Sequence, residues 1–141
     1  MLLHFRHLTS VIFTAFVVVS CSSAPPRPVV DIKISNDSTN DLTWVRVCWD
    51  EGEESAGVLP AGIWKVSLDA GLPKKPKSET AFVEFADEKD DWTGKDNSQR
   101  KRYRIPVDVS PLRQLTAGHY GVTFSILSFT EAKLQIEKKD R

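Results

Sequence analysis

Hydrophobic and polar residues alternate in short runs from Val29 onward, and turn residues separate the runs. Alternation with period two is typical of half-buried β-strands, whereas no apolar stretch in this region keeps the spacing of a helix. The alternating runs are Val30 to Ile34, Leu42 to Trp49, Ile63 to Leu68, Phe82 to Phe85, Tyr103 to Val107, Val122 to Ile126 and Leu134 to Ile136. The pattern predicts an all-β domain of seven to eight strands, packed as a two-sheet β-sandwich.

The strand predicted over Leu42 to Trp49 carries bulky side chains on both of its faces. Successive residues of a strand point to opposite sides, so Val45 and Val47 share one face while Trp44 and Arg46 share the other. Because both faces carry bulk, we expect this strand to lie in the centre of its sheet.

Proline and glycine mark the breaks between strands. Gly57 to Gly62 contains Pro60, which cannot donate to a strand ladder, and this segment predicts a bend. Pro106 in the same way marks the strand around it as an edge strand or an interrupted one. Ser110 followed by Pro111 predicts a single helical turn, with the serine as its cap and the proline in the first position.

The stretch from Leu115 to Tyr120 leads into the strand at Val122 and resembles the tyrosine corner of immunoglobulin-like sandwiches. In that motif a tyrosine hydroxyl bonds back to the backbone a few residues upstream. The cysteine and tryptophan framework of antibody domains is absent from the sequence. Immunoglobulin-like, transthyretin-like and C2-like sandwiches all remain compatible with the pattern.

The first twenty residues have a different build from the rest of the chain. Arg6 and two histidines give a weakly basic start, and Val11 to Val19 is an apolar stretch broken by Thr14. This is the build of a secretory signal, and the stretch is shorter than the roughly 20 residues that a membrane-spanning helix needs. We therefore expect residues 1–20 to be a lipoprotein signal peptide. An uncleaved anchor is the alternative.

The four residues ending at Cys21, Val-Val-Ser-Cys, resemble a bacterial lipobox. The resemblance implies cleavage before Cys21 and attachment of palmitate-type acyl chains to it, the alternative being a plain secreted protein with an incidental cysteine. Residues 21–28 then form a lipidated, Pro-rich tether, and residues 29–141 form the sandwich domain. No aspartate follows the cysteine, which by analogy with Gram-negative lipoproteins favours the periplasmic face of the outer membrane.

The net charge and the number of cysteines indicate whether the protein binds nucleic acid and whether it forms a disulfide. Lysine and arginine together number 19, as do aspartate and glutamate, so the formal net charge is zero. A balanced charge does not favour nucleic acid as a partner. With Cys21 lipidated, Cys48 has no cysteine to pair with, so we expect no internal disulfide.

The residues of the expected mature domain do not form a catalytic constellation. Their single histidine, His119, lies beside the expected tyrosine corner, and we interpret it as a partly exposed structural residue. Cys48 in mid-strand is interpreted as a small buried hydrophobic residue rather than a nucleophile. The sequence offers no histidine pair for zinc and no glycine-rich phosphate loop. It therefore predicts a protein that is not an enzyme and uses no metal or cofactor.

Two acidic segments are candidates for binding a protein partner. Asp87 to Asp91 lacks the ordered alternation of an EF-hand loop, so we predict no calcium site there. Trp92 follows among polar residues and is interpreted as a binding hot spot, as packing on its own domain or as a lipid contact. If Asp50 to Glu54 converges with this segment, the two form an acidic rim around the tryptophan. The candidate partner-binding residues are Trp92, Asp90, Asp91, Glu53, Glu54 and Trp64.

Four short segments occur in order along the predicted domain: Asn36 to Ser38, Trp44 to Val47, Gly57 to Lys65 and Ala81 to Phe85. Together they resemble small bacterial lipoproteins encoded beside type VI secretion effectors, several of which are immunity proteins against antibacterial phospholipases. The resemblance implies a protein that binds a lipase-like toxin in the periplasm and blocks its catalytic cleft. A structural or assembly lipoprotein is the alternative, because the sandwich lipoprotein of the secretion apparatus shares the anchor and a transthyretin-like fold.

Overall fold

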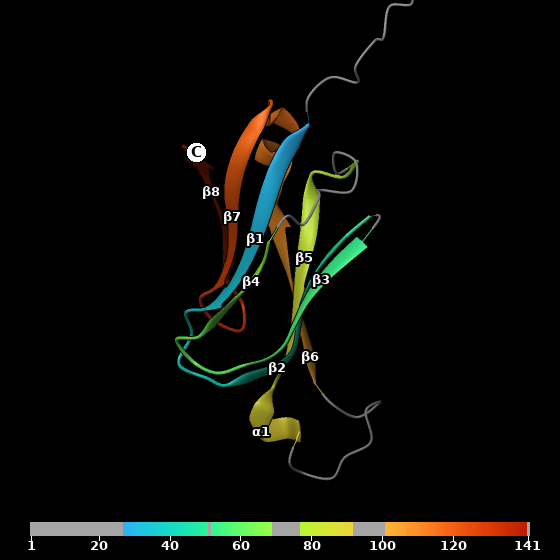
Figure 1. Ribbon diagram of the computed structural model, residues 1–141. Helices are drawn as coiled ribbons and strands as arrows, with labels where there is room; N and C mark the ends of the chain where they lie inside the picture. Colours follow the sequence, from blue (N-terminus) through green and yellow to red (C-terminus); the bar gives the residue numbers. More distant parts are fainter. Residues whose placement is uncertain (1–26, 51, 69–76, 92–100, 141) are drawn as a thin grey trace, which may run out of the picture.

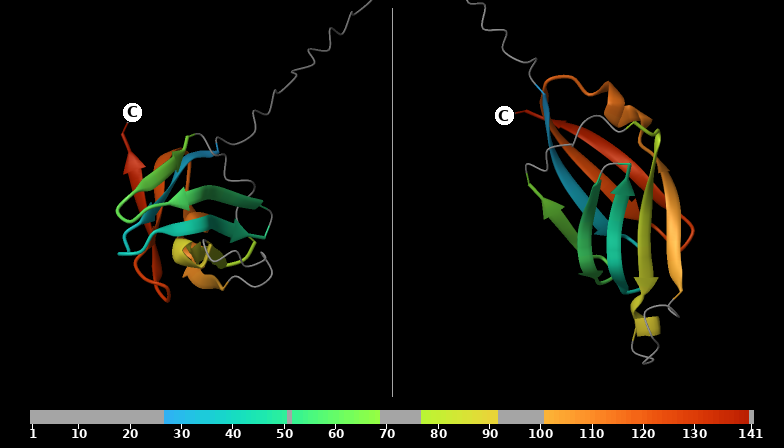
Figure 2. Two further views of the ribbon diagram at one scale, coloured as in Figure 1. Left: turned by 90° about the horizontal axis from the view of Figure 1, so that it is seen from below. Right: turned by 90° about the vertical axis from the view of Figure 1, so that its right-hand side faces the viewer.

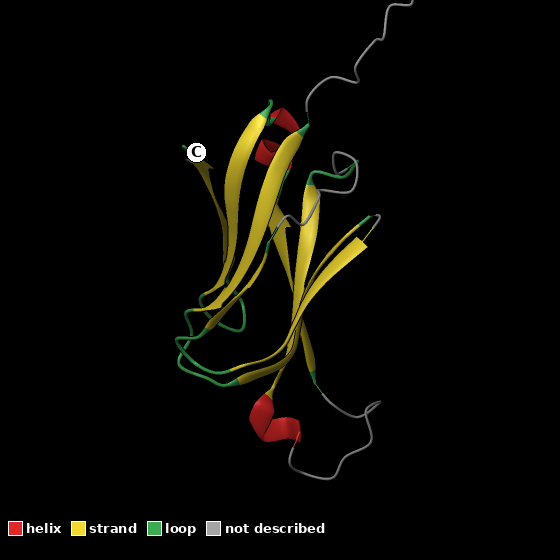
Figure 3. Cartoon of the chain, viewed as in Figure 1, coloured by secondary structure: helices red, strands yellow, loops and turns green. Residues whose placement is uncertain are grey.

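The computed structural model describes residues 27–50, 52–68, 77–91 and 101–140, apart from the side chains of Asp90 and Asp91. Within these residues the chain forms two four-stranded sheets that pack face to face (Figure 1). Helical structure is limited to two short turns at the ends of the sandwich (Figure 3), and neither is long and apolar enough to span a bilayer. The prediction of an all-β, two-sheet sandwich is confirmed, with eight strands.

Seven of the eight strands follow the predicted runs closely, whereas the third, Gly52–Leu59, corresponds to none of them. In chain order the strands are β1 (Pro28–Asn36), β2 (Leu42–Trp49), β3 (Gly52–Leu59), β4 (Trp64–Ser67), β5 (Thr80–Asp87), β6 (Arg102–Asp108), β7 (Gly118–Ile126) and β8 (Ala132–Lys139). The helix α1 (Glu88–Asp91) follows β5, and a 3₁₀ helix (Ser110–Gln114) lies between β6 and β7.

One sheet, here called sheet A, has the strand order β4-β1-β7-β8, and the other, sheet B, has the order β3-β2-β5-β6. All neighbouring strands are antiparallel except β1 and β7, which run parallel. In an immunoglobulin-like sandwich the first two strands are neighbours in one sheet, whereas here β1 and β2 lie in different sheets. Of the three sandwiches that the sequence allowed, this order is the transthyretin-like one.

Apolar side chains from the inward faces of both sheets fill the space between them. Val30, Ile32 and Ile34 of β1 are buried, as their alternation predicted. Val45 and Val47 of β2 are fully buried, so the predicted inward face of that strand is confirmed. β2 also lies between β3 and β5, in the centre of its sheet, as its two bulky faces indicated.

The segment around β3 differs from the sequence prediction. β3 runs through Leu59 and pairs with β2, so Gly57 lies within a strand and not at the start of a bend. The chain turns later, where the Ile63 N–H donates to the Pro60 carbonyl at 3.1 Å. The acidic segment from Asp50 to Glu54, for which no strand was predicted, likewise enters β3 at Gly52. Pairing with a neighbouring strand here overrides the local turn preference of glycine.

In the region from β6 to β7, the edge strand and the helical turn were predicted correctly, whereas the cap residue of the turn was predicted wrongly. β6, which contains Pro106, is an edge strand, and a helical turn with proline in its first turn follows. Val109, not Ser110, occupies the cap position, and it makes no side-chain hydrogen bond there. Ser110 instead donates from its hydroxyl and its backbone N–H to Asp108, and these bonds lower the pKa of the Asp108 carboxyl. The serine is therefore a donor to Asp108, two residues earlier, and not an acceptor for the turn.

Tyr120 is buried on β7, where the tyrosine corner was predicted. Its hydroxyl lies 3.4 Å from the hydroxyl of Thr116, four residues upstream. The partner is thus a side chain and not the backbone group that the motif requires. The resemblance to a tyrosine corner is local, in keeping with a strand order that is not immunoglobulin-like.

The two ends of the sandwich can be told apart by the direction of β1 (Figures 1 and 2). We call the end at which β1 begins, at Pro28, the tether end. β1 finishes at Asn36 at the opposite, distal end, where α1 also lies. β1 has nine residues, so at about 3.3 Å per residue the two ends are about 30 Å apart.

Candidate functional site

A bulge on β2 breaks the alternation of this central strand. Leu42 and Val45 are both fully buried, although residues three positions apart in a regular strand face opposite sides. One extra residue is accommodated between them, and the register with β5 shifts at this point. The extra residue is absorbed at Trp44, whose φ of 55° lies in the left-handed region. Among the described residues, Trp44 is the only one other than glycine with a positive φ.

β3 carries a matching irregularity opposite the bulge. Ala56 and Leu59 are both buried despite the same separation of three positions. Gly57 pairs with Val45 and has a φ of +70°, which glycine adopts without strain. A Cβ at this glycine would meet no atom within 4 Å, so the outer face beside Trp44 is open. The two strands therefore deviate together and leave space around the tryptophan.

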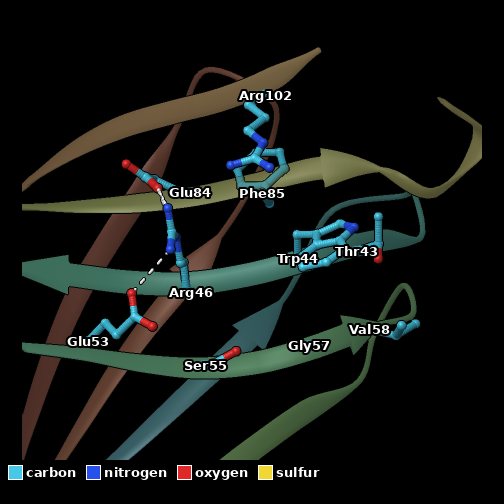
Figure 4. Close-up of a pocket in the computed structure, with 10 residues that line it drawn as sticks. All are labelled: Thr43, Trp44, Arg46, Glu53, Ser55, Gly57, Val58, Glu84, Phe85 and Arg102. Atoms are coloured by element: carbon cyan, nitrogen blue, oxygen red, sulfur yellow. Dashed lines mark hydrogen bonds and ion pairs between the residues drawn. The ribbon is translucent and has the colours of Figure 1, made fainter. Parts of the chain in front are cut away.

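Trp44 stands on the outer face of sheet B with 51% of its surface exposed. It lines a groove of about 610 Å³ together with Val58, which is 58% exposed, and with Arg46, Glu84 and Arg102 (Figure 4). A left-handed conformation costs a residue other than glycine about 1–2 kcal/mol. Strain of this kind persists where it serves a site, so a strained and exposed tryptophan indicates a binding surface.

An ion-pair network crosses the outer face of sheet B beside Trp44. The Arg46 guanidinium lies 2.7 Å from Glu84 and 3.2 Å from Glu53, which come from the strands on either side of β2. The Glu84 carboxylate also lies 3.3 Å from Arg104 on β6. The hydrogen bond to Glu84 raises the pKa of Arg46. Because these groups are partly exposed, the network adds little stability, but it fixes the positions of the side chains beside the groove.

Arg102 reaches the same groove from β6 and is not part of this network. Its neighbour on β5 is Ala86, a small residue. The carboxylates that form ion pairs among the described residues pair with other groups, and none of them pairs with Arg102; they are Asp31, Glu53, Glu79 and Glu84. The groove therefore presents a guanidinium that this part of the chain does not neutralise.

Cys48 lies farther along the outer face of β2. It is only partly buried, whereas the sequence was interpreted as placing a small buried hydrophobic residue there. Burial raises the pKa of its thiol, and the negative charge of Glu84 raises it further. The thiolate is the reactive form of cysteine, so a raised pKa disfavours a role as nucleophile at neutral pH.

The acidic rim that the sequence suggested is not formed. Glu53 and Glu54 lie at the start of β3, at the end of sheet B opposite α1, which contains Asp90 and Asp91 (Figure 2). The two glutamates also point to different sides. Glu53 joins the network on the outer face, whereas Glu54 accepts a hydrogen bond of 2.9 Å from Ser67 of β4. The antiparallel pairing of β2 with β5 places the two acidic segments at opposite ends of the sheet.

Two of the predicted site residues, Cys21 and Trp92, lie outside the described residues, so their roles stay predictions. Trp64 is on β4, at the edge of sheet A, and is 56% exposed. The ammonium of Lys33 lies 4.8 Å from the centroid of its ring, within cation–π distance. Trp64 is thus about as exposed as Trp44, but it lies on the other sheet and already has a cation over its ring.

Sequence reasoning missed a buried charge cluster on the outer face of sheet A. The Asp31 carboxylate lies 2.8 Å from His119 Nε2 and 2.7 Å from Lys139 Nζ, and its side chain is only 7% exposed. Alternation places Asp31 outward, which normally means solvent. Here the lysine passes over Gly121, where the position of a Cβ would be 3.1 Å from Lys139 Cε. His119 is therefore a structural residue, held by an aspartate far away in the sequence.

Asn36 organises the distal end of the sandwich. Its buried amide donates to the carbonyls of Asn40 and Leu59, both at 2.8 Å. The amide oxygen accepts hydrogen bonds from the backbone N–H and the hydroxyl of Ser38. The Asn36 backbone N–H donates to Ile63. These bonds join the turn after β1 to the bend after β3, and so fix the end of β3 that borders the groove.

The groove carries recognition chemistry in the form of an aromatic face, an apolar neighbour and an unpaired guanidinium. Within the described part of the chain, no group of three or more histidine, cysteine, aspartate or glutamate side chains is placed to hold a metal ion. The sequence reasoning identified Trp44 only as bulk on a central strand. The one local sign of the site is the pair of apolar residues three positions apart, Leu42 and Val45.

Comparison with known proteins does not assign a family. No family model matches the chain, and none of the curated proteins matches it. An NMR structure of a protein from Eubacterium rectale is similar over 79% of this chain and 91% of its own, with 11% sequence identity and a TM-score of 0.42. At this identity and TM-score the similarity carries no statement about function.

Proposed function

We propose that this protein is a periplasmic, lipid-anchored immunity protein that binds and blocks a type VI secretion effector of the antibacterial phospholipase class. The lipobox-like residues that end at Cys21 support the anchor. The resemblance of the segments between Asn36 and Phe85 to effector-associated lipoproteins supports the role. The protein acts by occluding the catalytic cleft of the effector and catalyses no reaction itself.

The observation that carries the proposal is the state of Trp44. The core does not require an aromatic residue there, because the buried residues are its neighbours Leu42 and Val45. Both the strained backbone and the exposed ring are unfavourable in the isolated domain. Tryptophan in such a position is enriched among the few residues that dominate the energy of protein interfaces. A partner that covers the Trp44 ring would remove its apolar surface from water and so offset these unfavourable terms.

The direction of the chain supports the same role. Trp44 is the third residue of β2, which begins at the distal end, so the tryptophan lies in the half of the sandwich remote from Pro28. With Cys21 in the membrane, Trp44 faces the periplasm, about 20–30 Å beyond the tether end. The anchor keeps the inhibitor at the surface that a phospholipase attacks.

Protection of the producing cell is the direct test. A strain that lacks the gene is mixed with sister cells that secrete the effector encoded beside it, and the survivors are counted. We expect the deletion strain to be killed and complementation to restore survival. The purified protein should also inhibit the phospholipase activity of that effector at a molar ratio near one. Equal survival of the deletion strain and the wild type would contradict the proposal.

A control separates the anchor from the binding module. Cys21→Ser removes the site of lipidation and leaves the sandwich unchanged. We expect this variant to inhibit the effector in solution as well as the wild type does, and to protect cells less. If the variant protects cells fully, the anchor has no part in immunity.

A second function, a structural or assembly lipoprotein of the secretion apparatus, is favoured by one observation. The strand order β4-β1-β7-β8 and β3-β2-β5-β6 is transthyretin-like, as is the sandwich lipoprotein of that apparatus. The deletion strain discriminates the two. Loss of a component of the apparatus abolishes secretion of all effectors, whereas loss of an immunity protein leaves secretion intact and removes protection.

A further inference from the structure

We infer that the groove on sheet B recognises a partner segment in which an apolar side chain stands beside a carboxylate. The apolar side chain packs on Trp44 and Val58, and the carboxylate pairs with Arg102. The identity of the partner rests on the proposed function. The chemistry of the groove is argued from the structure alone.

The apolar half of the groove is open on both sides of its tryptophan. Gly57 on β3 has no side chain, and Ala86 on β5 has only a methyl group. These two positions therefore add little side-chain bulk beside Trp44, which is 51% exposed. Val58 extends the apolar surface toward the edge of the sheet and is itself 58% exposed. A partner side chain that fills this space removes apolar surface of both residues from water.

The charged half of the groove contains one arginine that is available to a ligand. Arg46 and Arg104 both pair with Glu84, which uses its two carboxylate oxygens for them. Glu53 also pairs with Arg46, so both acidic residues of the groove are occupied. Arg102 is left with a charge that no carboxylate of the described residues compensates, next to an apolar surface. An incoming carboxylate meets a guanidinium that it can bind through two parallel hydrogen bonds without displacing an internal partner.

The groove is rigid before it binds. Its floor consists of paired strands, and the ion pairs across β3, β2, β5 and β6 hold the long side chains next to it. Arg104 is held further by the ring of Phe82, which lies 3.7 Å from its guanidinium carbon. The cost of ordering the Arg46, Glu84 and Arg104 side chains on association is therefore already met in the free protein, which favours affinity.

Trp64 provides a matched comparison on the other sheet. It is as exposed as Trp44, but its backbone is unstrained and Lys33 lies over its ring. A partner would have to displace that cation to use the ring. For this reason we place the recognition site at Trp44 and use the pair of Trp64 and Lys33 as the control.

Binding of the purified mature protein to the effector encoded by the adjacent gene tests the inference. We expect Trp44→Ala and Arg102→Glu each to raise the Kd about tenfold or more, as hot-spot residues do. The matched controls Trp64→Ala and Lys33→Glu should change the Kd less than about threefold. Melting temperatures recorded in parallel separate a loss of binding from a loss of folding.

A small probe tests the chemistry of the groove without the effector. 3-Phenylpropionate joins an aromatic ring to a carboxylate, whereas phenethylamine joins the same ring to a cation. In an NMR titration of the mature protein, we expect the anion to shift the signals of the Trp44 indole and the Arg102 guanidinium. The cation should leave them in place. Arg102→Glu should abolish the response to the anion.

The outcomes distinguish this inference from the proposed function. If the probe shifts the groove signals but the wild-type protein does not bind the effector, the proposed function fails and the inference stands. If the effector binds the wild type and both groove variants equally well, the inference is wrong and the function stands. A response centred on Trp64, or an equal response to phenethylamine, also overturns the inference.

Discussion

Sheet A keeps a continuous register along its four strands, whereas sheet B is interrupted where β2 passes Trp44. The inward faces of the two sheets are alike, because both supply fully buried aliphatic and aromatic side chains to one core. The outward faces differ, since sheet A covers a buried aspartate while sheet B exposes a tryptophan. The core therefore defines the fold, and an irregularity confined to one sheet creates the candidate binding surface.

The two outer faces also treat charge differently. On sheet A, Asp31 is withdrawn from water and lies 2.8 Å from His119 of β7 and 2.7 Å from Lys139 of β8. On sheet B, the Arg46 and Glu84 pair is partly exposed, and Arg102 has no acidic partner among the described residues. The charges that join strands are buried around Asp31 on sheet A, whereas on sheet B they are partly exposed and Arg102 is presented at the surface.

The shared core is tested by removing one large ring from each sheet. Phe124 of sheet A and Phe85 of sheet B are each 1% exposed. We expect Phe124→Ala and Phe85→Ala each to lower the free energy of unfolding by about 3–5 kcal/mol, because each leaves a cavity between the sheets. Urea unfolding measures both. If either variant lost less than about 1 kcal/mol, the two inward faces would not contribute equally to the stability of the core.

The contrast in charge is tested by neutralising one carboxylate on each sheet. We expect Asp31→Asn to lower the free energy of unfolding by about 1–3 kcal/mol, because a buried charged acceptor is lost. Glu84→Gln should cost less than about 1 kcal/mol, because the Arg46 and Arg104 side chains are 38% and 60% exposed. Chemical denaturation of both variants gives the comparison, and equal losses would show that burial does not separate the two faces.

The strain at the bulge is tested by substituting each exposed tryptophan with asparagine. Asparagine tolerates the left-handed conformation better than tryptophan does, so Trp44→Asn should raise the free energy of unfolding by up to about 1 kcal/mol. Trp64→Asn relieves no strain and should leave stability unchanged or slightly lower. Thermal unfolding measures both. A lower stability for Trp44→Asn would mean that the ring contributes more to the fold than to binding.

The smallest effect concerns the reactivity of Cys48. Burial raises the pKa of its thiol in the folded state, so alkylation by iodoacetamide should begin at a higher pH in the folded protein than in the urea-unfolded chain. The protonated thiol favours the folded state below the unfolded pKa, and this advantage is lost as the pH rises through the folded pKa. Glu84→Gln should move the folded profile to lower pH, because the Glu84 charge also raises the pKa. If the pH profile of alkylation is the same in Glu84→Gln as in the wild type, the Glu84 charge does not raise the pKa of the Cys48 thiol.

The pattern along the chain predicted most of the fold. Alternation identified the strand β2 and the buried residues Val30, Ile32 and Ile34, and Pro106 identified an edge strand. These features are local, because a strand that buries one face must repeat its apolar residues with period two. The pattern failed at β3. Glycine and proline predicted a bend that begins at Gly57, whereas the strand continues to Leu59.

The candidate site was largely beyond the reach of the sequence. Glu53 was identified, but with acidic residues that lie at the other end of the sheet. Trp44 was placed on the correct face of β2, yet its strain and its exposure depend on the bulge. In a bulge, two residues of one strand lie opposite one residue of the neighbouring strand. A bulge is therefore a property of the pairing of two strands and not of one strand.

The sequence by itself determined that this chain forms an all-β sandwich, which residues fill its core and which segment resembles a lipid anchor. The tertiary structure alone decided the strand order, the position of Arg102 beside Trp44 and the pairing of Asp31 with Lys139, 108 positions away. The physical reason is the separation in sequence of the residues that interact. Alternation is set between adjacent residues, whereas the site depends on which strands lie side by side, and many orders of strands satisfy the same alternation.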